Sequence, residues 1–346
     1  MDVLVLATNR PERARAFLEA WDGVGSWDGV IVVEDGPSCS SLASPRTIPV
    51  LAHVCWADLD THEDSWIISR RDAAIKAFGC LLAAERGATR IHLLDDDCLP
   101  WEGQDVAAAH RQRLTEGLAE SAWMSSVPGL RVRGLPYGNT QRRVLPAVSM
   151  GLWAGVPDLD ASTALVQGTP HEFTPPPDAW VAPPHQYVPI CGMNLAFRVE
   201  VLPLLYFAPM GVGQPVGRFD DIWLGLVAQR GFAALGQRIA VGGAVVHHVR
   251  ASDPFTNLRR EATGVALHEH LWRLIDGIPV TARAPAAIAT EIGAGLLALA
   301  EAVPLTDLRG YVGLYGFALQ RWADVAAAAV SAGRSVTMPS ASEAAS

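Results

Sequence analysis

The sequence predicts an α/β fold in which a mixed, mostly parallel sheet is flanked by helices, with a helical region after it. Two observations predict this fold. Short apolar runs rich in β-branched residues alternate with helical segments through the first 97 residues. Beyond about residue 253 the sequence is Ala-rich, poor in charge and helical in pattern. The first alternation is typical of βαβ units, whose parallel strands are covered by helices on both faces.

The first part of the chain divides into successive elements. Strands are expected over 2–8, 29–36 and 47–56, with a helix from about Pro11 to Trp21 between the first two. A long amphipathic helix is expected over 69–87, and it leads into the apolar run "TRIHLLDDD". Ligands bind beyond the carboxyl ends of parallel strands, so polar residues at those ends are candidate site residues.

We expect three regions in the chain. Residues 1–252 should form the domain that carries the site, and residues 253–333 a C-terminal helical region packed on that domain. Residues 334–346 are polar, and we expect them to form a flexible tail.

The composition predicts a globular protein and excludes some partners. Of 346 residues, 50% are hydrophobic and 18% are charged, which is enough apolar material for a sizeable core. The net charge of −9 and the pI near 5.6 offer no basic surface to a phosphate backbone. Nucleic acid is therefore not an expected partner.

The cysteines and the apolar tracts indicate a cytoplasmic protein. The five cysteines are odd in number and contain no CxxC pair, so neither a disulfide framework nor a zinc knuckle is indicated. The N-terminal apolar run is too short for a secretory signal. The longest apolar tract, 286–303, is interrupted by Glu291 and Glu301, whereas a membrane span needs about 20 predominantly apolar residues. No membrane span is expected.

Three consecutive aspartates, Asp95, Asp96 and Asp97, follow an apolar run. Side chains alternate along a strand, so Asp95 and Asp97 should share one side while Asp96 faces the other. Two carboxylates at this spacing suit Mg²⁺ or Mn²⁺, which takes few protein oxygens and completes its shell with water and substrate phosphate. The alternative is a capping and turn cluster at the strand end. A cation explains the triplet better, because mutual repulsion otherwise disfavours it.

Five blocks of the sequence, in the same order, resemble the reversibly glycosylated polypeptide family, which includes the plant UDP-arabinopyranose mutases. They are "DDDC" at 95–98, "AVSMGLWAGVPDLDASTAL" at 147–165, "PICGMNLAF" at 189–197, "MGVGQPVGRFDDIW" at 210–223 and "ASDPFTNLRRE" at 251–261. The resemblance implies a GT-A-like, Rossmann-like nucleotide-sugar fold. It also implies a flavin-independent interconversion of the pyranose and furanose forms of UDP-L-arabinose, with reversible attachment of the sugar to an arginine of the protein.

That arginine lies in a stretch which reads "VRGLPYG" at 132–138, so the resemblance implies that Arg133 is glycosylated. Leu135 takes the family's aromatic position, and Tyr137 follows two residues later. A second family arginine corresponds to Arg142 or Arg143, because this chain has one extra residue before them. Taken without the family, Arg133 reads as a solvated charge or a phosphate clamp.

An arginine nucleophile needs a base, because a guanidinium has no free lone pair at neutral pH. The stretch "GRFDDIWLG" places Asp220 and Asp221 at the start of an expected helix. Such carboxylates commonly complement a helix dipole, but two adjacent ones also suit acid and base work on sugar hydroxyls. The resemblance favours the second role.

The remaining candidates surround the expected nucleotide pocket. His248 corresponds to a family histidine and is a candidate third metal ligand beside Asp95 and Asp97. Asp35 follows the second strand and could accept from the uracil N–H. The other residues expected to contact the nucleotide are Thr8, Arg10, Arg71, Asp72, Asp96 and Arg250.

Two further functions stay open. The same site would serve a metal-dependent glycosyltransferase that delivers the sugar to an external acceptor, and Leu135 leaves room for a non-catalytic UDP-sugar-binding scaffold. The segment "GVGQPVG" at 211–217 lacks the dinucleotide-binding spacing, so flavin and NAD are not expected. The expected partner is a UDP-sugar, and a homo-oligomer is compatible with the sequence.

Overall fold

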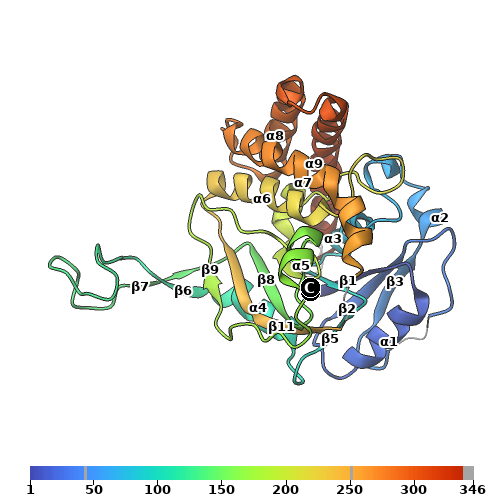
Figure 1. The fold of residues 1–346 in the computed structure, drawn as a ribbon. Coiled ribbons are helices and arrows are strands. Elements are labelled where there is room, and N and C mark those ends of the chain that lie inside the picture. The colour runs from blue at the N-terminus through green and yellow to red at the C-terminus, as the bar shows by residue number, and fades with distance from the viewer. Residues whose placement is uncertain (43–44, 250–251, 338–346) are drawn as a thin grey trace, which may run out of the picture.

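The computed structural model describes residues 1–42, 45–249 and 252–337 (Figure 1). A nine-stranded mixed sheet forms its centre, in the order β3-β2-β1-β4-β10-β8-β11-β5, with β9 paired to β11. The strands are β1 (Asp2–Thr8), β2 (Gly29–Glu34), β3 (Val50–Val54), β4 (Arg90–Asp95), β5 (Cys98–Pro100), β8 (Val148–Gly155), β9 (Trp180–Val181), β10 (Asn194–Arg198) and β11 (Ile239–His248). Strands β3, β2, β1 and β4 are mutually parallel, and β10 runs antiparallel to both of its neighbours. The predicted α/β fold is confirmed.

The apolar runs form strands because the sheet is covered on both faces. In β1, Val3 and Val5 belong to one apolar cluster, whereas Leu4 and Leu6 belong to the cluster on the opposite face. Alternate side chains of a strand point to opposite faces, so a strand buried on both faces must be apolar throughout. This is the reason for the uninterrupted run "VLVL" in the sequence.

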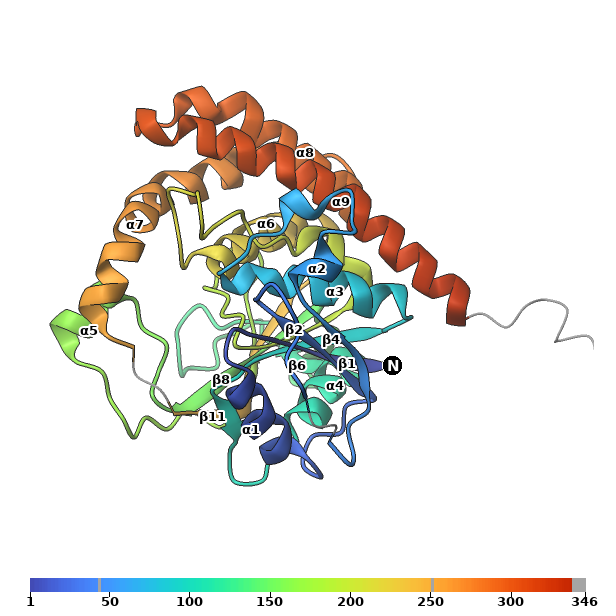
Figure 2. The ribbon, with the colours of Figure 1, turned by 90° about the vertical axis from the view of Figure 1, so that its right-hand side faces the viewer.

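Helices cover the two faces unequally (Figure 2). Helices α1 and α4 pack on one face, and α3, α6 and the C-terminal helices pack on the other. The α-helices are α1 (Pro11–Trp21), α2 (Trp56–Leu59), α3 (Lys76–Glu85), α4 (Val106–Glu116), α5 (Ala161–Gln167), α6 (Asp220–Leu235), α7 (Pro254–Gly277), α8 (Pro285–Leu299) and α9 (Arg309–Thr337). Short 3₁₀ turns are η1 (Ser65–Ile67), η2 (Ala73–Ile75), η3 (Val199–Leu204), η4 (Ala300–Ala302) and η5 (Thr306–Leu308).

The prediction of a long helix over 69–87 is wrong at the N-terminal end of that range. The α-helix begins only at Lys76, because Arg71 has a left-handed φ of 55° and Asp72 is extended, with its side chain accepting from the N–H of Ala74. Neither backbone conformation continues a helix. The chain therefore turns at Arg71 and Asp72, which places both side chains in the wall of the cavity described below.

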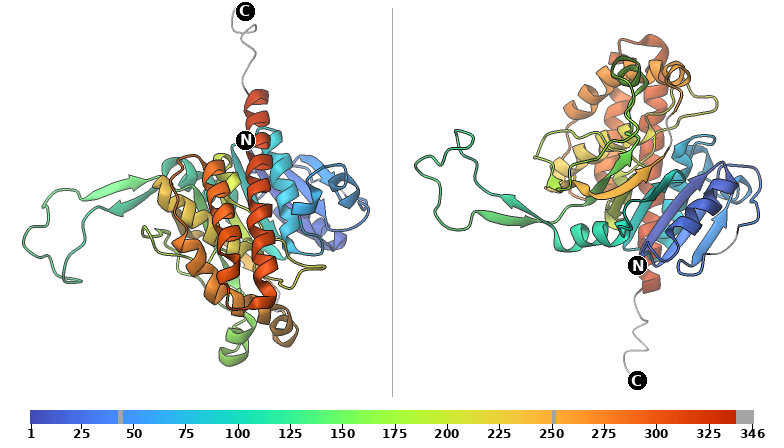
Figure 3. Two further views of the ribbon diagram at one scale, coloured as in Figure 1. Left: turned by 90° about the horizontal axis from the view of Figure 1, so that it is seen from above. Right: turned by 60° about the horizontal axis from the view of Figure 1, so that its bottom comes forward.

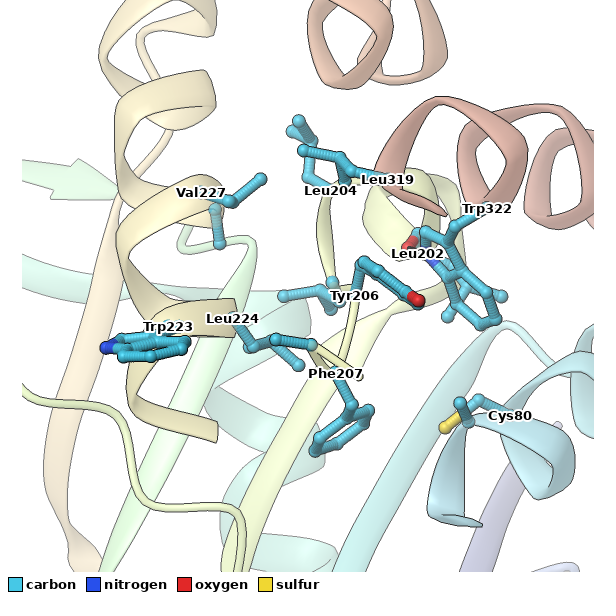
Figure 4. Packing of buried hydrophobic residues seen from close by; sticks show 14 of the residues in the cluster. Cys80, Leu202, Leu204, Tyr206, Phe207, Trp223, Leu224, Val227, Leu319 and Trp322 are labelled. Carbon is cyan, nitrogen blue, oxygen red and sulfur yellow. Dashed lines mark hydrogen bonds between the residues drawn. The ribbon is translucent and has the colours of Figure 1, made fainter. Parts of the chain in front are cut away.

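The C-terminal helices share the larger apolar cluster with the sheet (Figure 4). Trp322 of α9 stacks on Tyr206 with ring centroids 5.5 Å apart, and its indole N–H donates to the carbonyl of Leu202 at 3.1 Å. Helix α9 runs to Thr337, so the segment expected to be a flexible tail begins as helix at 334. Residues 338–346 lie outside the described residues.

Helix α8 is the most apolar of these elements. Among the described residues, the segment Pro285–Ala302 is long and apolar enough to cross a membrane by length and composition alone. Its Ile288, Ile292 and Leu296 are fully buried in the same cluster as α9, as in a core helix that passes the same test.

A hairpin projects from the body of the molecule (Figures 1 and 3). It consists of β6 (Leu118–Ser121) and β7 (Gln141–Val144), which pair antiparallel, and of the loop between them. We call residues 118–144 the arm.

Candidate functional site

A cavity of about 410 Å³ lies where β1, β2 and β4 end. Eleven of the residues expected from the sequence line it: Thr8, Arg10, Asp35, Arg71, Asp72, Asp95, Asp96, Asp97, Asp220, Asp221 and His248. Parallel strands bring their carboxyl ends to one edge of a sheet, which explains why residues far apart in sequence meet here.

Asp96, the middle aspartate of the triplet, points inward. Its carboxylate accepts from the hydroxyl of Thr8 at 2.6 Å and from Nη2 of Arg10 at 2.5 Å. Burial raises the pKa of Asp96, against the opposing effects of Thr8 and Arg10. Asp96 thereby holds Arg10 at the end of β1, and each of its two oxygens keeps a second lone pair for a ligand.

Asp95 is paired with Lys76, a residue that the sequence reasoning missed. Nζ of Lys76 donates to Asp95 and also to the carbonyl of Gly192 at 3.1 Å. The lysine is only 3% exposed. Burial alone would lower its pKa, but Asp95, Asp220 and Asp221 reverse this and raise the pKa above its usual value. The ammonium group therefore stays charged inside the cavity wall.

Asp97 and His248 fit a divalent cation. Nδ1 of His248 lies 2.7 Å from the carbonyl of Val156, which can only accept, so Nδ1 donates the hydrogen bond and the lone pair of a neutral ring lies on Nε2. That Nε2 lies 3.8 Å from Oδ1 of Asp97, so two electron donors face each other. The other oxygen of Asp97 lies 3.7 Å from Nη1 of Arg13. A cation between Nε2 and Oδ1 would remove the repulsion of the two lone pairs.

The three expected ligands do not converge fully. The ligand atoms of Asp95, Asp97 and His248 do not all lie within 4.8 Å of one another in the described structure. Nζ of Lys76 donates to Oδ1 of Asp95, so a cation bound at this carboxylate would have to share it with the lysine. Asp97 and His248 are therefore the stronger pair of ligands, and Asp95 would contribute only by sharing its carboxylate with Lys76.

Asp220 and Asp221 begin α6 in the floor of the cavity, and their environments differ. Asp220 is 4% exposed, and its Oδ2 has no hydrogen-bond partner among the described residues. Burial, followed by repulsion from Asp72 and Asp221, raises the pKa of Asp220 well above its usual value. The buried position of Asp220 therefore favours the neutral, protonated carboxyl over the carboxylate.

Asp221 is held differently. Its Oδ2 accepts from the N–H of Gly192 at 2.7 Å. Burial raises its pKa to about 6, with repulsion from Asp158 and Asp95 adding to the increase. Two neighbouring carboxyl groups with separated pKa values are the arrangement that supplies an acid and a base at one pH.

Asp35 and Asp72 form a polar wall near the end of β2. The carboxylate of Asp35 accepts from the indole N–H of Trp56 at 2.7 Å and from the N–H of Asp72 at 3.0 Å. Each oxygen of Asp35 keeps a second lone pair for a ligand. Burial raises the pKa of Asp72, and repulsion from Asp35 adds to the effect.

Two arginines in the cavity wall have left-handed backbones. Arg71 has φ of 55° and Arg218 has φ of 65°. Residues other than glycine rarely adopt this conformation, and when they do they cluster at functional sites. Nε of Arg218 donates to Glu261 at 2.7 Å, and Glu261 in turn accepts from the N–H of Ala161. Arg218 thereby joins the starts of α5 and α6 to α7.

Sequence reasoning missed several residues of the wall, although most lie in blocks that carry the family resemblance. They are Lys76, Asp158, Asp160, Cys191, Arg218, Arg260 and Glu261. Sγ of Cys191 donates to Asp158 at 3.2 Å. Burial and the neighbouring Asp158 and Asp221 raise the pKa of this thiol well above its usual value. Cys191 is therefore a neutral thiol and not a nucleophile.

The three expected catalytic arginines are not in the cavity. All three lie in the arm, where Arg133 is exposed, Arg142 pairs with Glu120 at 2.7 Å and Arg143 donates to the carbonyl of Glu116 at 2.8 Å. Within one chain the structure does not bring these arginines to the aspartates, because a two-stranded stem carries them away from the body. Arg250 lies outside the described residues.

Comparison with known proteins identifies the family. A sequence profile described as "Reversibly glycosylated polypeptide" matches residues 1–303. The chain is 36% identical over 277 residues to a probable UDP-arabinopyranose mutase 1 of Solanum tuberosum, covering 74% of this chain and 72% of the relative. It is 32% identical over 276 residues to a probable UDP-arabinopyranose mutase 1 of Pisum sativum, with 74% and 72% covered. UDP-arabinopyranose mutase 1 of Arabidopsis thaliana is 30% identical over 287 residues, with 78% and 77% covered. The chain belongs to the reversibly glycosylated polypeptide family.

Proposed function

We propose that the protein is a UDP-sugar mutase that interconverts the pyranose and furanose forms of UDP-L-arabinose without flavin or NAD. The observation that carries the proposal is the pair of neighbouring carboxyl groups in one cavity wall, in which burial favours the neutral form of Asp220 while Asp221 accepts from the N–H of Gly192 and has a pKa of about 6. Ring interconversion needs both an acid and a base. The names of the relatives support the substrate. We also propose a cytoplasmic location, which the unpaired state of the five cysteines supports.

The nucleotide end of the substrate would lie among the basic residues of the cavity. Arg10 is oriented by Asp96, and Arg71 and Arg218 line the same space. Asp97 and His248, with Asp95 beside them, would hold Mn²⁺ or Mg²⁺, which when bound neutralises charge on the departing diphosphate. The arginines and the bound cation would together offset the negative charge of the three aspartates. The site could then bind the diphosphate, which is an anion.

The reaction opens the sugar ring at C1. A guanidinium nitrogen of Arg133 would bond to C1 as the bond from C1 to the UDP oxygen breaks, and the guanidinium would lose a proton to the carboxylate of Asp221. The ring oxygen would then leave with the proton of the Asp220 carboxylic acid, while the other oxygen of Asp220 takes the N–H proton of the glycosylated nitrogen. This gives an open-chain imine, and the guanidinium keeps its single positive charge.

Closure reverses these steps through a different oxygen. A second hydroxyl of the sugar attacks C1 and gives its proton to one oxygen of Asp220, while the other oxygen of Asp220 returns a proton to the nitrogen. UDP then re-forms its bond to C1 as the bond from C1 to nitrogen breaks, and the guanidine recovers its proton from Asp221. Atoms, charges and protons balance, and both carboxyl groups end as they began.

A non-catalytic scaffold and a glycosyltransferase are the competing functions. The buried, unpartnered oxygen of Asp220 in the cavity wall favours an enzyme over a scaffold, because an unsatisfied carboxyl there reduces stability and an acid or base would use it. A transferase would use the metal and nucleotide groups in the same way, and differs only in the fate of the sugar.

One experiment separates the three functions. Purified protein is incubated with UDP-arabinopyranose and Mn²⁺, and the nucleotides are separated by anion exchange. A new UDP-arabinofuranose peak with no free UDP supports the mutase. Release of UDP that depends on an added acceptor supports the transferase, and binding without any turnover supports the scaffold.

A further inference from the structure

The arm presents exposed apolar side chains that nothing within the described chain covers. Tyr137 is 97% exposed, Met124 91% and Trp123 52%, and Val127 and Leu130 are also exposed. Large apolar side chains grouped on one projecting element mark an interaction surface. The arm lies well apart from the body in both views of Figure 3, and none of its residues lines the cavity.

The tip of the arm is ordered by its own contacts. The guanidinium of Arg131 lies 4.7 Å from the ring centroid of Tyr137 and donates to the carbonyl of Pro136. The hydroxyl of Ser125 donates to the carbonyl of Leu130 at 2.5 Å. A loop held in this way presents Arg133 in a preformed shape, which reduces the entropy lost when it binds.

The charges of the arm and the cavity are complementary. The arm carries four arginines and one glutamate, in a chain whose net charge is −9. The cavity wall holds ten Asp and Glu residues against four arginines and one lysine. An acidic cavity of this kind repels a diphosphate until cations are added, and an arm rich in arginine supplies them.

The stem of the arm fixes its direction away from its own body. The two strands pair from Leu118 opposite Val144 to Ser121 opposite Gln141. Arg143 ties the stem to the end of α4 through the carbonyl of Glu116. At Gly117, a Cβ atom would lie 2.5 Å from the carbonyl oxygen of Val144, so the two ends of the stem are in close contact. Folding the arm back onto its own cavity would break these contacts.

We infer that the arm of one copy of this chain enters the cavity of a second copy and brings Arg133 to the sugar there, in a reciprocal two-fold dimer. The inference rests on the proposed function in assigning the attack on C1 to Arg133. Each complete site then contains the aspartates of one chain and the arginine of the other. Reciprocal exchange is the closed arrangement expected when one surface patch binds another patch of an identical chain.

Heterodimers with differently tagged chains test the exchange. Arg133→Ala inactivates an arm and Asp221→Asn inactivates a cavity, so each homodimer is inactive. A heterodimer with one change on each chain keeps one intact arm facing one intact cavity, and should retain about half of the wild-type mutase activity. An inactive heterodimer of this kind, beside an active wild type, overturns the exchange.

The matched control places both changes on one chain, with the other chain unchanged. Exchange predicts that this heterodimer is inactive, because the intact arm meets the altered cavity and the intact cavity meets the altered arm. Delivery within one chain predicts about half of the activity instead. The two heterodimers contain the same substitutions, so a difference between them comes from their distribution and not from a loss of folding.

Cross-linking tests the contact without any activity. A benzophenone amino acid replaces Tyr137 in protein mixed from ¹⁴N- and ¹⁵N-labelled copies, and cross-linked peptides are weighed. We expect links between differently labelled copies, joining the arm to the cavity segment 210–223. Links within one copy only, or none to the cavity, overturn the inference. If the wild type has no mutase activity but these links form, the proposed function fails while the exchange stands.

Discussion

Lys76 donates a hydrogen bond from its buried ammonium group to Asp95, the first of three consecutive aspartates. The pair joins the start of α3 to the end of β4 and places a positive charge between the triplet and the second acidic pair, Asp220 and Asp221. The ammonium group of Lys76 thus offsets part of the negative charge of the aspartates that surround it in the cavity wall.

Replacing this lysine should destabilise the fold. Lys76→Met removes the cation and leaves Asp95, whose side chain is 34% exposed, without its partner, which should lower the free energy of unfolding by about 1–3 kcal/mol. Urea denaturation measures the loss. The control is Arg46→Met, which removes a guanidinium that is 90% exposed beside Asp22 and should therefore have a much smaller effect. Equal effects of the two substitutions would contradict a structural role for the buried ion pair.

Asp221 should impose a pH dependence on stability. Its pKa is about 6 in the folded protein and about 3.9 in an unfolded chain. Between pH 4 and 6, Asp221 therefore binds more protons in the folded state than in the unfolded state. The stability that this group contributes is greatest below pH 4 and falls as the pH rises to 6. This group alone should account for a fall of about 3 kcal/mol.

The difference between two variants isolates this effect. Asp221→Asn should remove that part of the fall in unfolding free energy between pH 4 and 6, whereas the exposed control Asp178→Asn should retain it. Denaturation at a series of pH values gives the comparison. If the unfolding free energy of Asp221→Asn falls between pH 4 and 6 as steeply as that of the wild type, the carboxyl of Asp221 does not titrate in this pH range.

Both the successes and the failures of the sequence reasoning have physical causes. The apolar run of β1 predicted a strand because a strand that is buried on both faces has apolar side chains at consecutive positions. The late start of α3 was missed because the conformation of Arg71 depends on a distant loop: a Cβ at Gly211 would lie 2.8 Å from the carbonyl of Arg70. Such packing leaves no local pattern.

In the candidate site, too, local patterns were predicted and features that depend on distant residues were missed. Asp95 and Asp97 stood out because three adjacent carboxylates are unusual in a chain. Lys76 was missed because a lysine at the start of a helix is ordinarily solvated, and its burial depends on aspartates distant in sequence. The projection of the arm was missed because residues 118–144 carry no periodicity that distinguishes a hairpin from a loop over the surface.

The contact at Gly211 can be tested with a matched neighbour. Gly211 and Gly213 have φ of 83° and 80°, so alanine at either position pays a similar backbone penalty, about 1–2 kcal/mol. Only Gly211→Ala pushes against the backbone of Arg70, because a Cβ at Gly213 meets nothing within 4 Å. We expect weaker UDP binding by calorimetry in Gly211→Ala than in Gly213→Ala. Equal affinities would mean that the position of Arg71 does not govern binding.

Metal binding should depend on Asp97 and His248. Asp97→Asn and His248→Gln should each reduce Mn²⁺ affinity by about 10–100-fold, measured by electron paramagnetic resonance of free Mn²⁺. Asp178→Asn serves again as the control and should bind normally. Excess EDTA should abolish mutase turnover, and full turnover under EDTA would rule out a required metal.

The most direct test of the account is to locate the sugar on the protein. Wild-type protein is incubated with UDP-arabinopyranose, quenched in acid and analysed by intact mass and peptide mapping. We expect one pentose adduct on Arg133 that disappears when excess UDP is added, and loss of both adduct and mutase activity in Arg133→Ala. An adduct on Arg142 or Arg143 would move the nucleophile within the arm. Undiminished mutase activity in Arg133→Ala, with no adduct on any residue, would contradict the account.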